Sequence, residues 1–432
     1  MGIIEILILV LSFLILLAIG VPVAWTLGIA SVLTILFSLD SITALTTMAQ
    51  QVLTSLDSFT LLAIPFFILA GQLMNKGGIA TRLINFAKNI IGSLPGGLAH
   101  INVVAAMLFG AIAGSSVAAA SAIGSILGPR MEKEGYTKEF GAAINISSST
   151  MGLIIPPSNI LIVYSLASGG TSIAALFIAG YIPGILTGLI LMGVAAVWAM
   201  WKNFPVGERS SFKNLLQSFF HALPSLLLLI IVIGGIVIGI FTATEAAAIA
   251  VVYTLGLAFF YKELTFRDLP DVLMDSVQTT SIVMLLIATS ISMSWVMSFG
   301  HIPQSISEGL LALSDNKILL LLIINMILLG VGMFMDMTPA VLIFTPIFLP
   351  VVAELGIDPV HFGIIMIMNL CIGICTPPVG TLLFVGVSVA GTTIEKVIKP
   401  LMPLFIAMLL TLMLVTFWED LSLMLPRLFD LM

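Results

Sequence analysis

The chain consists largely of apolar stretches separated by short polar or glycine- and proline-rich interruptions. Apolar segments cover residues 3–19, 21–38, 59–74, 173–201, 222–240, 242–261, 277–299 and 401–418. An α-helix needs about 20 apolar residues to cross the hydrocarbon core of a bilayer, and most of these segments approach or exceed that length. Lipid cannot satisfy free backbone groups, so only helices or closed barrels span it. Because the runs are too long for barrel strands, the pattern predicts an all-α polytopic membrane protein.

Two more apolar stretches are interrupted near their centres by a polar, helix-breaking tip. Residues 98–131 contain Gly-Ser-Ser at 114–116, and residues 318–355 contain Asp-Met-Thr-Pro at 336–339. The arms on either side of each tip span about 15 residues, which is short for a membrane crossing. We therefore predict two re-entrant helical hairpins. Two full spans in the same place would also return the chain to its starting side, so arm length and tip polarity carry this prediction.

Two other apolar segments, residues 139–168 and 359–390, share the motif Gly-x-x-x-Pro-Pro at 152–157 and 373–378. Proline has no N–H, so each pair should break its helix and leave carbonyls one turn earlier without partners. Free carbonyls in lipid are unfavourable unless a neighbour, water or a bound ion satisfies them. The motif predicts two broken transmembrane helices, with free carbonyls at Gly152, Leu153, Gly373 and Ile374.

The two halves of the chain repeat this plan at a nearly constant offset. Matching features lie 218 to 222 residues apart: Gly20 with Gly239, residues 56–58 with 274–276, Gly135 with Gly356, residues 140–141 with 362–363, and the two Pro-Pro motifs. We expect a first repeat over 1–201, with scaffold spans 3–75, an interfacial arm helix 76–93, hairpin 98–131, broken helix 139–168 and span 173–201. A cytoplasmic linker, 202–220, should follow. The second repeat, 221–432, should contain scaffold spans 221–299, arm 300–316, hairpin 318–355, broken helix 359–390 and span 401–418.

Charged residues make up only 8% of the 432 residues, which excludes a soluble domain and, with no basic run, a nucleic-acid partner. If the loop 202–213 is cytoplasmic, 13 of the 15 Lys and Arg fall inside, leaving Lys317 and Arg427 outside. The same count places both termini in the periplasm. It makes the first hairpin enter from the cytoplasm and the second from outside, so the repeats should have inverted topology. The first segment, with Glu5 and no basic start, is read as a retained helix rather than a signal peptide.

The duplicated tips and breaks are the candidate binding site, because paired helix interruptions are the sequence signal of a transporter site. Helix N-termini offer N–H groups and partial positive charge to a substrate carboxylate, and oxygen ligands suit a hard cation such as Na⁺. Arginine is absent from the presumed core, so an anionic substrate would be held by dipoles, hydroxyls and co-bound cations. The candidate substrate ligands are Ser116, Ser149, Pro156, Asn159, Thr338, Pro377 and Thr381.

Several of these residues have a structural alternative. Ser116 and Thr338 carry ordinary N-cap signals, and Ser147 to Ser149 could bond back to carbonyls of their own helix. Asp336 could ligate a cation, cap a helix or carry a proton. It makes the second tip the more electrostatic one, so cation binding there should depend more on pH. Four further residues are read as structural: Cys371, Cys375, His100 and His361.

Four stretches resemble the large membrane subunit of tripartite ATP-independent periplasmic (TRAP) transporters, and the resemblance covers essentially the whole chain. They are FGAIAGSSVAAA at 109–120, GLIIPPSN at 152–159, GMFMDMTP at 332–339 and GICTPPVG at 373–380. The resemblance implies Na⁺-driven secondary active uptake of an organic acid, such as a C4-dicarboxylate or sialic acid, across the bacterial inner membrane, with no enzymatic activity. It also implies two protein partners, a small four-helix membrane subunit and a periplasmic substrate-binding protein, within a membrane-lipid environment.

The same resemblance places two sodium sites at the hairpin tips and the facing broken helices. An elevator motion is expected, in which hairpins and broken helices slide against a scaffold of the remaining spans and the arm 76–93. A stand-alone dicarboxylate symporter, needing no binding protein, is the alternative. An intramembrane protease is opposed by the lack of a matching His partner or a His-Glu-x-x-His motif, and a passive channel by two occluding hairpins. The implied sodium ligands are Gly114, Ser115, Ser116, Gly152, Gly332, Asp336, Thr338, Gly373, Thr376 and Gly380.

Overall fold

The computed structural model describes residues 3–92, 94–202, 204, 211–314 and 316–432. These residues fold into helices, and no strand occurs among them. Eight of the described helices are long and apolar enough to cross a bilayer, and the pair Lys138–Ile154 and Asn159–Ala167, bent by 51°, would make a ninth. The chain is therefore a multi-pass helical membrane protein, as its hydrophobic pattern predicts.

The first half begins with two separate helices joined by a tight turn at Gly20, whose φ of 84° favours glycine. The polar stretch 39–56, for which the pattern predicts no span, is helical and is capped by Asp40, which accepts from Thr43 N at 3.1 Å. The elements are α1 (Ile3–Ala18), α2 (Val23–Ser38), α3 (Ser41–Leu56), η1 (Phe59–Leu62), α4 (Ala63–Lys76), α5 (Ile79–Ile91), α6 (Gly97–Ala113), α7 (Ser116–Lys133), α8 (Lys138–Ser149), α9 (Met151–Ile154), α10 (Asn159–Ala167) and α11 (Ile173–Trp201).

The second half differs from expectation at both ends. The linker predicted over 202–220 is too long, because a helix already begins at Phe212. Phe219 of this helix packs against Phe86 of α5, with ring centroids 5.7 Å apart. Residues 203 and 205–210 of the predicted linker lie outside the described residues. The last helix, α21, was not predicted, because it is too short to show as a span. The elements are α12 (Phe212–Val237), α13 (Ala243–Phe260), α14 (Leu269–Phe299), α15 (Ile302–Leu313), α16 (Lys317–Phe334), α17 (Met337–Glu354), α18 (Pro359–Gly373), α19 (Thr381–Ala390), α20 (Ile394–Phe417) and α21 (Asp420–Leu428).

The hairpin arms α6, α7, α16 and α17 are longer than the predicted 15 residues. They contain 17 residues in α6 and 18 in each of the others. The predicted arm ended before the first charged residues of the following turn, but α7 continues through Arg130. Arg130 forms an i,i+4 ion pair with Glu134 at 3.9 Å. Arm length therefore does not separate a hairpin from two spans, and the polar tips carry that distinction.

Each hairpin is fastened to its own broken helix by the same two contacts. The first is a backbone contact between glycines: a Cβ on Gly152 would lie 2.6 Å from Gly110 Cα, and one on Gly332 would lie 2.9 Å from Gly373 Cα. Only glycine permits such a close approach. The second contact is a buried hydrogen bond, about two turns away along the hairpin arm and one turn away along the broken helix. Ser148 Oγ donates to Asn102 Oδ1 at 2.9 Å in the first repeat, and Asn369 Nδ2 donates to Asn325 Oδ1 at 2.8 Å in the second.

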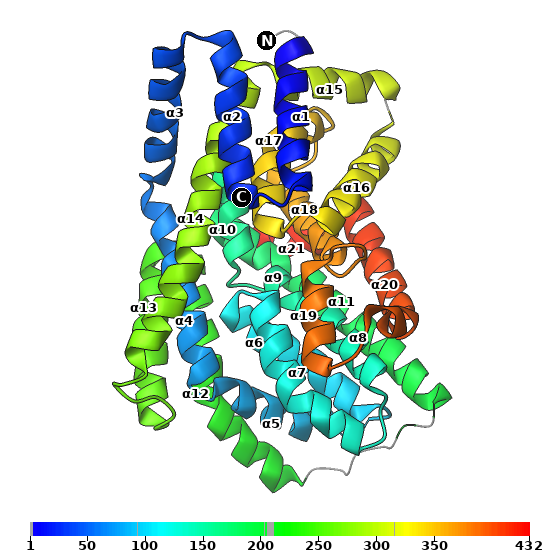
Figure 1. The fold of residues 1–432 in the computed structure, drawn as a ribbon. Helices are drawn as coiled ribbons and strands as arrows, with labels where there is room; N and C mark the ends of the chain where they lie inside the picture. The colour runs from blue at the N-terminus through cyan, green and yellow to red at the C-terminus, as the bar shows by residue number, and fades with distance from the viewer. Residues whose placement is uncertain (1–2, 93, 203, 205–210, 315) are drawn as a thin grey trace.

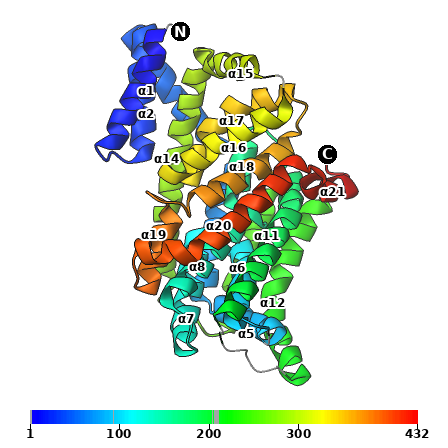
Figure 2. The ribbon, with the colours of Figure 1, turned by 90° about the vertical axis from the view of Figure 1, so that its right-hand side faces the viewer.

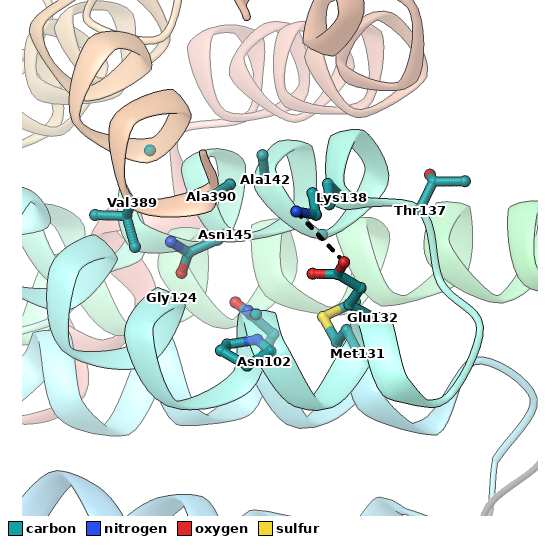
Figure 3. Close-up of a pocket in the computed structure, with 14 residues that line it drawn as sticks. Asn102, Gly124, Met131, Glu132, Thr137, Lys138, Ala142, Asn145, Val389 and Ala390 are labelled. Atoms are coloured by element: carbon teal, nitrogen blue, oxygen red, sulfur yellow. Dashed lines mark ion pairs between the residues drawn. The ribbon is translucent and has the colours of Figure 1, made fainter. Parts of the chain in front are cut away.

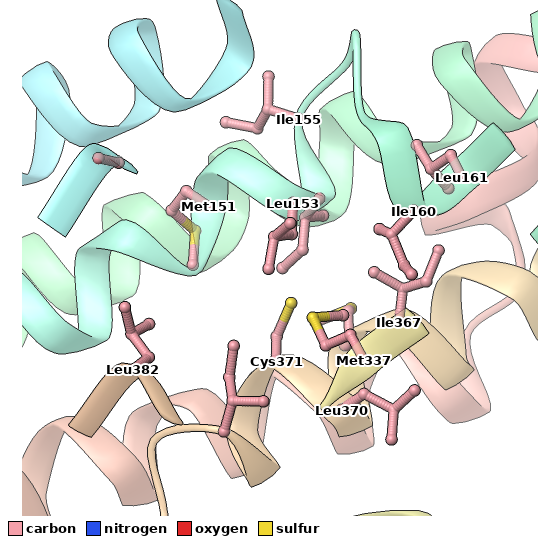
Figure 4. Close-up of a cluster of buried hydrophobic side chains, with 14 of the residues drawn as sticks. Met151, Leu153, Ile155, Ile160, Leu161, Met337, Ile367, Leu370, Cys371 and Leu382 are labelled. Atoms are coloured by element: carbon pink, nitrogen blue, oxygen red, sulfur yellow. The ribbon is translucent and has the colours of Figure 1, made fainter. Parts of the chain in front are cut away.

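The two halves meet at an apolar interface between the broken helices. Figure 4 shows Met151, Leu153 and Ile160 of the first repeat facing Ile367 and Leu370 of the second. The cysteines lie in this interface as fully buried filler: their thiols point to carbonyls of the other repeat, Cys371 Sγ to Thr150 O at 3.7 Å and Cys375 Sγ to Ile146 O at 3.8 Å. The hairpins and broken helices thus share one continuous core.

The remaining helices surround this core. In Figure 1, α4, α13 and α14 lie together along one side of the molecule, and the arm helices α5 and α15 lie at its two opposite ends. Figure 2 shows α11, α20, α18, α16 and α17 as an inclined stack on another side. Exposed ion pairs join segments of the two halves, Lys76 with Asp275 at 3.2 Å and Arg82 with Glu263 at 3.5 Å.

The glycine contacts predict a sharp difference between two positions on α16. Gly332→Ala places a Cβ against Gly373 and should destabilise the protein by about 1–3 kcal/mol, because the core must shift to admit it. Gly330→Ala is the matched control, since a Cβ there meets nothing within 4 Å. Thermal unfolding in detergent should show a lower midpoint for Gly332→Ala than for Gly330→Ala. Equal midpoints would mean that the two helices are not in backbone contact.

Candidate functional site

The first tip is a sharp break between α6 and α7. Gly114 takes a left-handed conformation with φ of 58°, and Ser115 is extended. Ser115 Oγ accepts from Ala118 N at 3.3 Å and so caps α7. The expectation that Ser116 is the cap is therefore wrong: it is the first residue of the helix. Since the cap satisfies one N–H, the N–H groups of Ser116 and Val117 still lack intrahelical partners.

The second tip differs from the first in backbone form and in chemistry, because Met335 is extended where Gly114 is left-handed. Asp336 is extended and occupies the N-cap position of α17, but its carboxylate makes no capping hydrogen bond. Thr338 lies in the first turn of α17 and is not its cap, which corrects the second N-cap expectation. The second tip therefore presents an uncapped carboxylate beside the free first-turn N–H groups of a helix.

Both tips line a single cavity of about 470 Å³. Helices α4 and α14 contribute to its wall, and so do the ends of the two broken helices. Asp336 is the single charged residue among the described residues that line it. The predicted site residues that the cavity brings together are Gly114, Ser115, Ser116, Asn159, Asp336, Thr338 and Thr381.

The first tip lies directly against the break in the first broken helix. A Cβ on Gly114 would lie 3.3 Å from Pro157 O and 3.5 Å from Asn159 Nδ2. Asn159 Oδ1 is shielded from solvent and has no hydrogen-bond partner among the described residues. An amide oxygen in this state is unfavourable and is a ready ligand for a cation or a donor group.

Three of the four carbonyls predicted to be free are in fact hydrogen-bonded. Ser158 Oγ donates to Leu153 O at 2.7 Å, and Thr376 N donates to Gly373 O at 2.8 Å. Leu382 N donates to Ile374 O at 3.1 Å, because α19 turns back over the break. The prediction overlooked that residues after the prolines return to the broken end. A carbonyl oxygen has two lone pairs, so each of these groups can still accept a cation.

The other predicted site residues lie outside the lining of the cavity. Gly152, Gly332 and Gly373 are at the glycine contacts, and Thr376 Oγ1 donates to Ile372 O at 2.7 Å. Ser149 Oγ is buried with no partner among the described residues. Ser147 bonds back to Ala143 O at 2.9 Å, as its structural alternative predicts. The remaining predicted residues, Pro156, Pro377 and Gly380, lie within or next to the two Pro-Pro breaks.

The cavity also contains polar residues that the sequence analysis missed. Gln72 and Asn75 reach it from α4, Thr279 from α14 and Ser121 from α7. Gln72 lies in an otherwise apolar span and Asn75 directly follows it, and an amide inside such a span is itself a signal of a polar cavity. The amide at Gln72 is therefore a signal in the sequence that points to this cavity.

A second, smaller cavity of about 80 Å³ lies between α7, α8 and α19. Figure 3 shows Asn102 and Asn145 at this cavity, with the Glu132–Lys138 ion pair nearby, at 3.3 Å. Asn145 Nδ2 donates to Ala120 O at 2.8 Å, while its Oδ1 has no partner among the described residues. Neither hairpin tip lines this cavity, so it is separate from the candidate site.

The helical bundle, its interrupted helices and the polar cavity between their ends define a multi-pass membrane transporter. Residues 10–421 match the family described as "Tripartite ATP-independent periplasmic transporter, DctM component", and the chain belongs to this family. Its members are transporter permeases and not enzymes.

Known proteins resemble the chain over nearly its full length. It is 56% identical to the uncharacterized protein YgiK of Salmonella typhimurium over 97% of this chain and 96% of that one. It is 44% identical to the C4-dicarboxylate TRAP transporter large permease protein DctM of Pseudomonas aeruginosa, over 93% and 94%. The fold also resembles the YdaH transporter of Alcanivorax borkumensis, with a TM-score of 0.66, 13% identity and coverage of 88% and 89%.

The cavity should be accessible to water at Val117. This residue is 42% exposed and lines the cavity, whereas the native Cys371 and Cys375 are 1% and 0% exposed. Val117→Cys should therefore react with a charged, water-soluble methanethiosulfonate reagent, while the wild-type protein should not. Mass spectrometry of the intact protein measures the adduct. An unreactive Val117→Cys variant would mean that the first tip is closed to water.

Proposed function

We propose that the protein is the large permease subunit of a Na⁺-coupled secondary active transporter that takes up an organic acid across the bacterial inner membrane. The observation that carries the proposal is the cavity lined by both helix tips. The tripartite description of the family supports two partners, a periplasmic binding protein that delivers the acid and a small membrane subunit. It opposes the alternative of a stand-alone symporter. The name of the Pseudomonas relative supports a C4-dicarboxylate as one candidate substrate.

The substrate carboxylate is bound between the tips. The first turns of α7 and α17 offer free N–H groups and the positive ends of two helix dipoles. Ser116, Thr338, Asn159 and Thr381 add hydroxyl and amide groups around the same cavity. No Lys or Arg is among the described residues that line it, so cations are needed to offset the charge of an anion beside Asp336.

Two Na⁺ ions supply this charge, one at each tip. The first site draws on oxygen atoms near Gly114, Ser115, Ser116 and Gly152, and the second on those near Asp336, Thr338 and Thr376, with Gly332, Gly373 and Gly380 shaping the backbone. Oxygen atoms of carbonyls, hydroxyls and carboxylates are the ligands that a hard cation prefers. Because the cations and the anion occupy one cavity, each favours binding of the other, and this couples transport to the Na⁺ gradient.

Alternating access is achieved by an elevator motion of the hairpins and broken helices. The shared apolar core and the paired glycine contacts support a unit that moves as one body. The positions of α5 and α15 at opposite ends of the molecule (Figure 1) support inverted repeats. Together with the 13 of 15 basic residues on one side, they support a cytoplasmic first hairpin and periplasmic termini.

Reconstitution tests the proposal. Proteoliposomes that contain this chain with its small subunit should accumulate radiolabelled succinate or N-acetylneuraminate when an inward Na⁺ gradient and the cognate binding protein are both supplied. Omitting either should abolish accumulation. Uptake that continues without the binding protein would favour the stand-alone symporter. Uptake driven equally well by a K⁺ gradient would contradict Na⁺ coupling.

Asp336 should be needed for coupling rather than for folding. Asp336→Asn keeps the shape of the tip but removes a charge from the second cation site, so the Na⁺ concentration for half-maximal uptake should rise at least tenfold. Asp271→Asn, an exposed aspartate in the first turn of α14, is the matched control and should leave it unchanged. An unaltered Na⁺ dependence in Asp336→Asn would remove the carboxylate from the site.

A further inference from the structure

The cavity receives polar groups from helices outside the hairpins and broken helices. Gln72 and Asn75 of α4 and Thr279 of α14 line it together with the two tips. We call these three residues the scaffold face. Helices α4 and α14 pack against each other and belong to the spans proposed to stay fixed during transport. The tips therefore belong to the part of the protein proposed to move, and the scaffold face belongs to the part proposed to stay fixed.

The scaffold face is built to hold a polar ligand. Gln72 and Asn75 are three residues apart, so they share one side of α4. Within the described residues, neither side chain makes a hydrogen bond. Thr279 Oγ1 donates to Asp275 O at 2.9 Å, which leaves its oxygen free to accept. Gln72 is half-buried and Asn75 is exposed at the end of α4, and both line the cavity, so their amides are available to a ligand there.

We infer that the scaffold face binds the end of the transported acid that is remote from the carboxylate held by the tips. This inference rests on the proposed function. An amide can donate to a second carboxylate or a carbonyl and can accept from a hydroxyl. The substrate class is therefore an organic acid with a second oxygen-bearing group. Gln72 and Asn75 therefore help to determine which organic acids the transporter accepts.

The contact exists on one side of the membrane only. Asn75 is followed by Lys76, whose ion pair with Asp275 measures 3.2 Å. The distribution of Lys and Arg assigns this end of α4 to the cytoplasm. When the hairpins slide toward the periplasm, the tips leave the scaffold face behind. The amides thus retain the acid at the stage of release into the cytoplasm and take no part in loading.

Sided binding measurements test this inference on the complete transporter. Inside-out vesicles report equilibrium binding of radiolabelled succinate, or of N-acetylneuraminate, from the cytoplasmic face in the presence of Na⁺. Right-side-out vesicles with binding protein report the concentration for half-maximal uptake. Gln72→Ala and Asn75→Ala should weaken cytoplasmic-face binding about tenfold or more, the loss expected for one hydrogen bond to a charged group. They should change half-maximal uptake less than twofold.

Gln278→Ala is the matched control, because Gln278 is an exposed amide next to Thr279 that is outside the cavity lining. Gln72→Glu keeps the side-chain shape and repels the anion, so it should weaken cytoplasmic-face binding more than Gln72→Ala does. The inference alone would be overturned if these variants bound the acid as tightly as the wild type does. It would also be overturned if they lost affinity equally on both faces of the membrane. No Na⁺-dependent binding of either acid to the wild-type transporter would contradict the proposed function, and the inference with it.

Discussion

The fold depends on one constraint: lipid offers no hydrogen bonds, so a helix can be interrupted in the membrane only where protein satisfies the broken ends. Two hairpin tips and two Pro-Pro breaks are such interruptions, and the structure packs them against one another. The glycine contacts, Gly110 with Gly152 and Gly332 with Gly373, allow the backbones to approach. The buried bonds Ser148–Asn102 and Asn369–Asn325 then fix the register. The cavity follows, because the two tips and the two breaks lie close together and leave polar groups facing a common space.

The two halves of the chain resemble each other in their order of helices but differ in chemistry. Both tips place an extended residue at the N-cap of the following helix, yet the first N-cap supplies a hydroxyl that caps the helix and the second bears an uncapped carboxylate. A second difference between the two halves lies at the small cavity that neither tip lines. Gly124 and Asn145 border a small cavity in the first repeat, whereas the positions 221 residues later hold Thr345 and Met366, which contact each other at 3.3 Å. The two halves therefore have different interiors at these positions.

Sequence patterns predicted the helical membrane class, both tips and both breaks, because proline, glycine and clustered hydroxyls in apolar sequence leave few structural options. These predictions were wrong where contacts between residues distant in the sequence determine the structure. The carbonyls of Leu153 and Ile374 were expected to be free, but Ser158 and α19 fold back to satisfy them. The start of α12 was missed because its contact with α5 is long-range. The amides of Gln72 and Asn75 became meaningful only when α4 was placed beside the tips. Local signals locate interruptions in helices, whereas packing determines what the interruptions face.

The central claim is that one acid and its coupling cations bind together between the two tips. An experimental structure of the complete transporter, determined by cryo-electron microscopy with Na⁺ and its acid, tests this most directly. Density for the acid is expected between Ser116 and Thr338, with separate cation density near Ser115 and near Asp336. Acid density outside this cavity, or an acid bound with both tips unoccupied by cations, would contradict it.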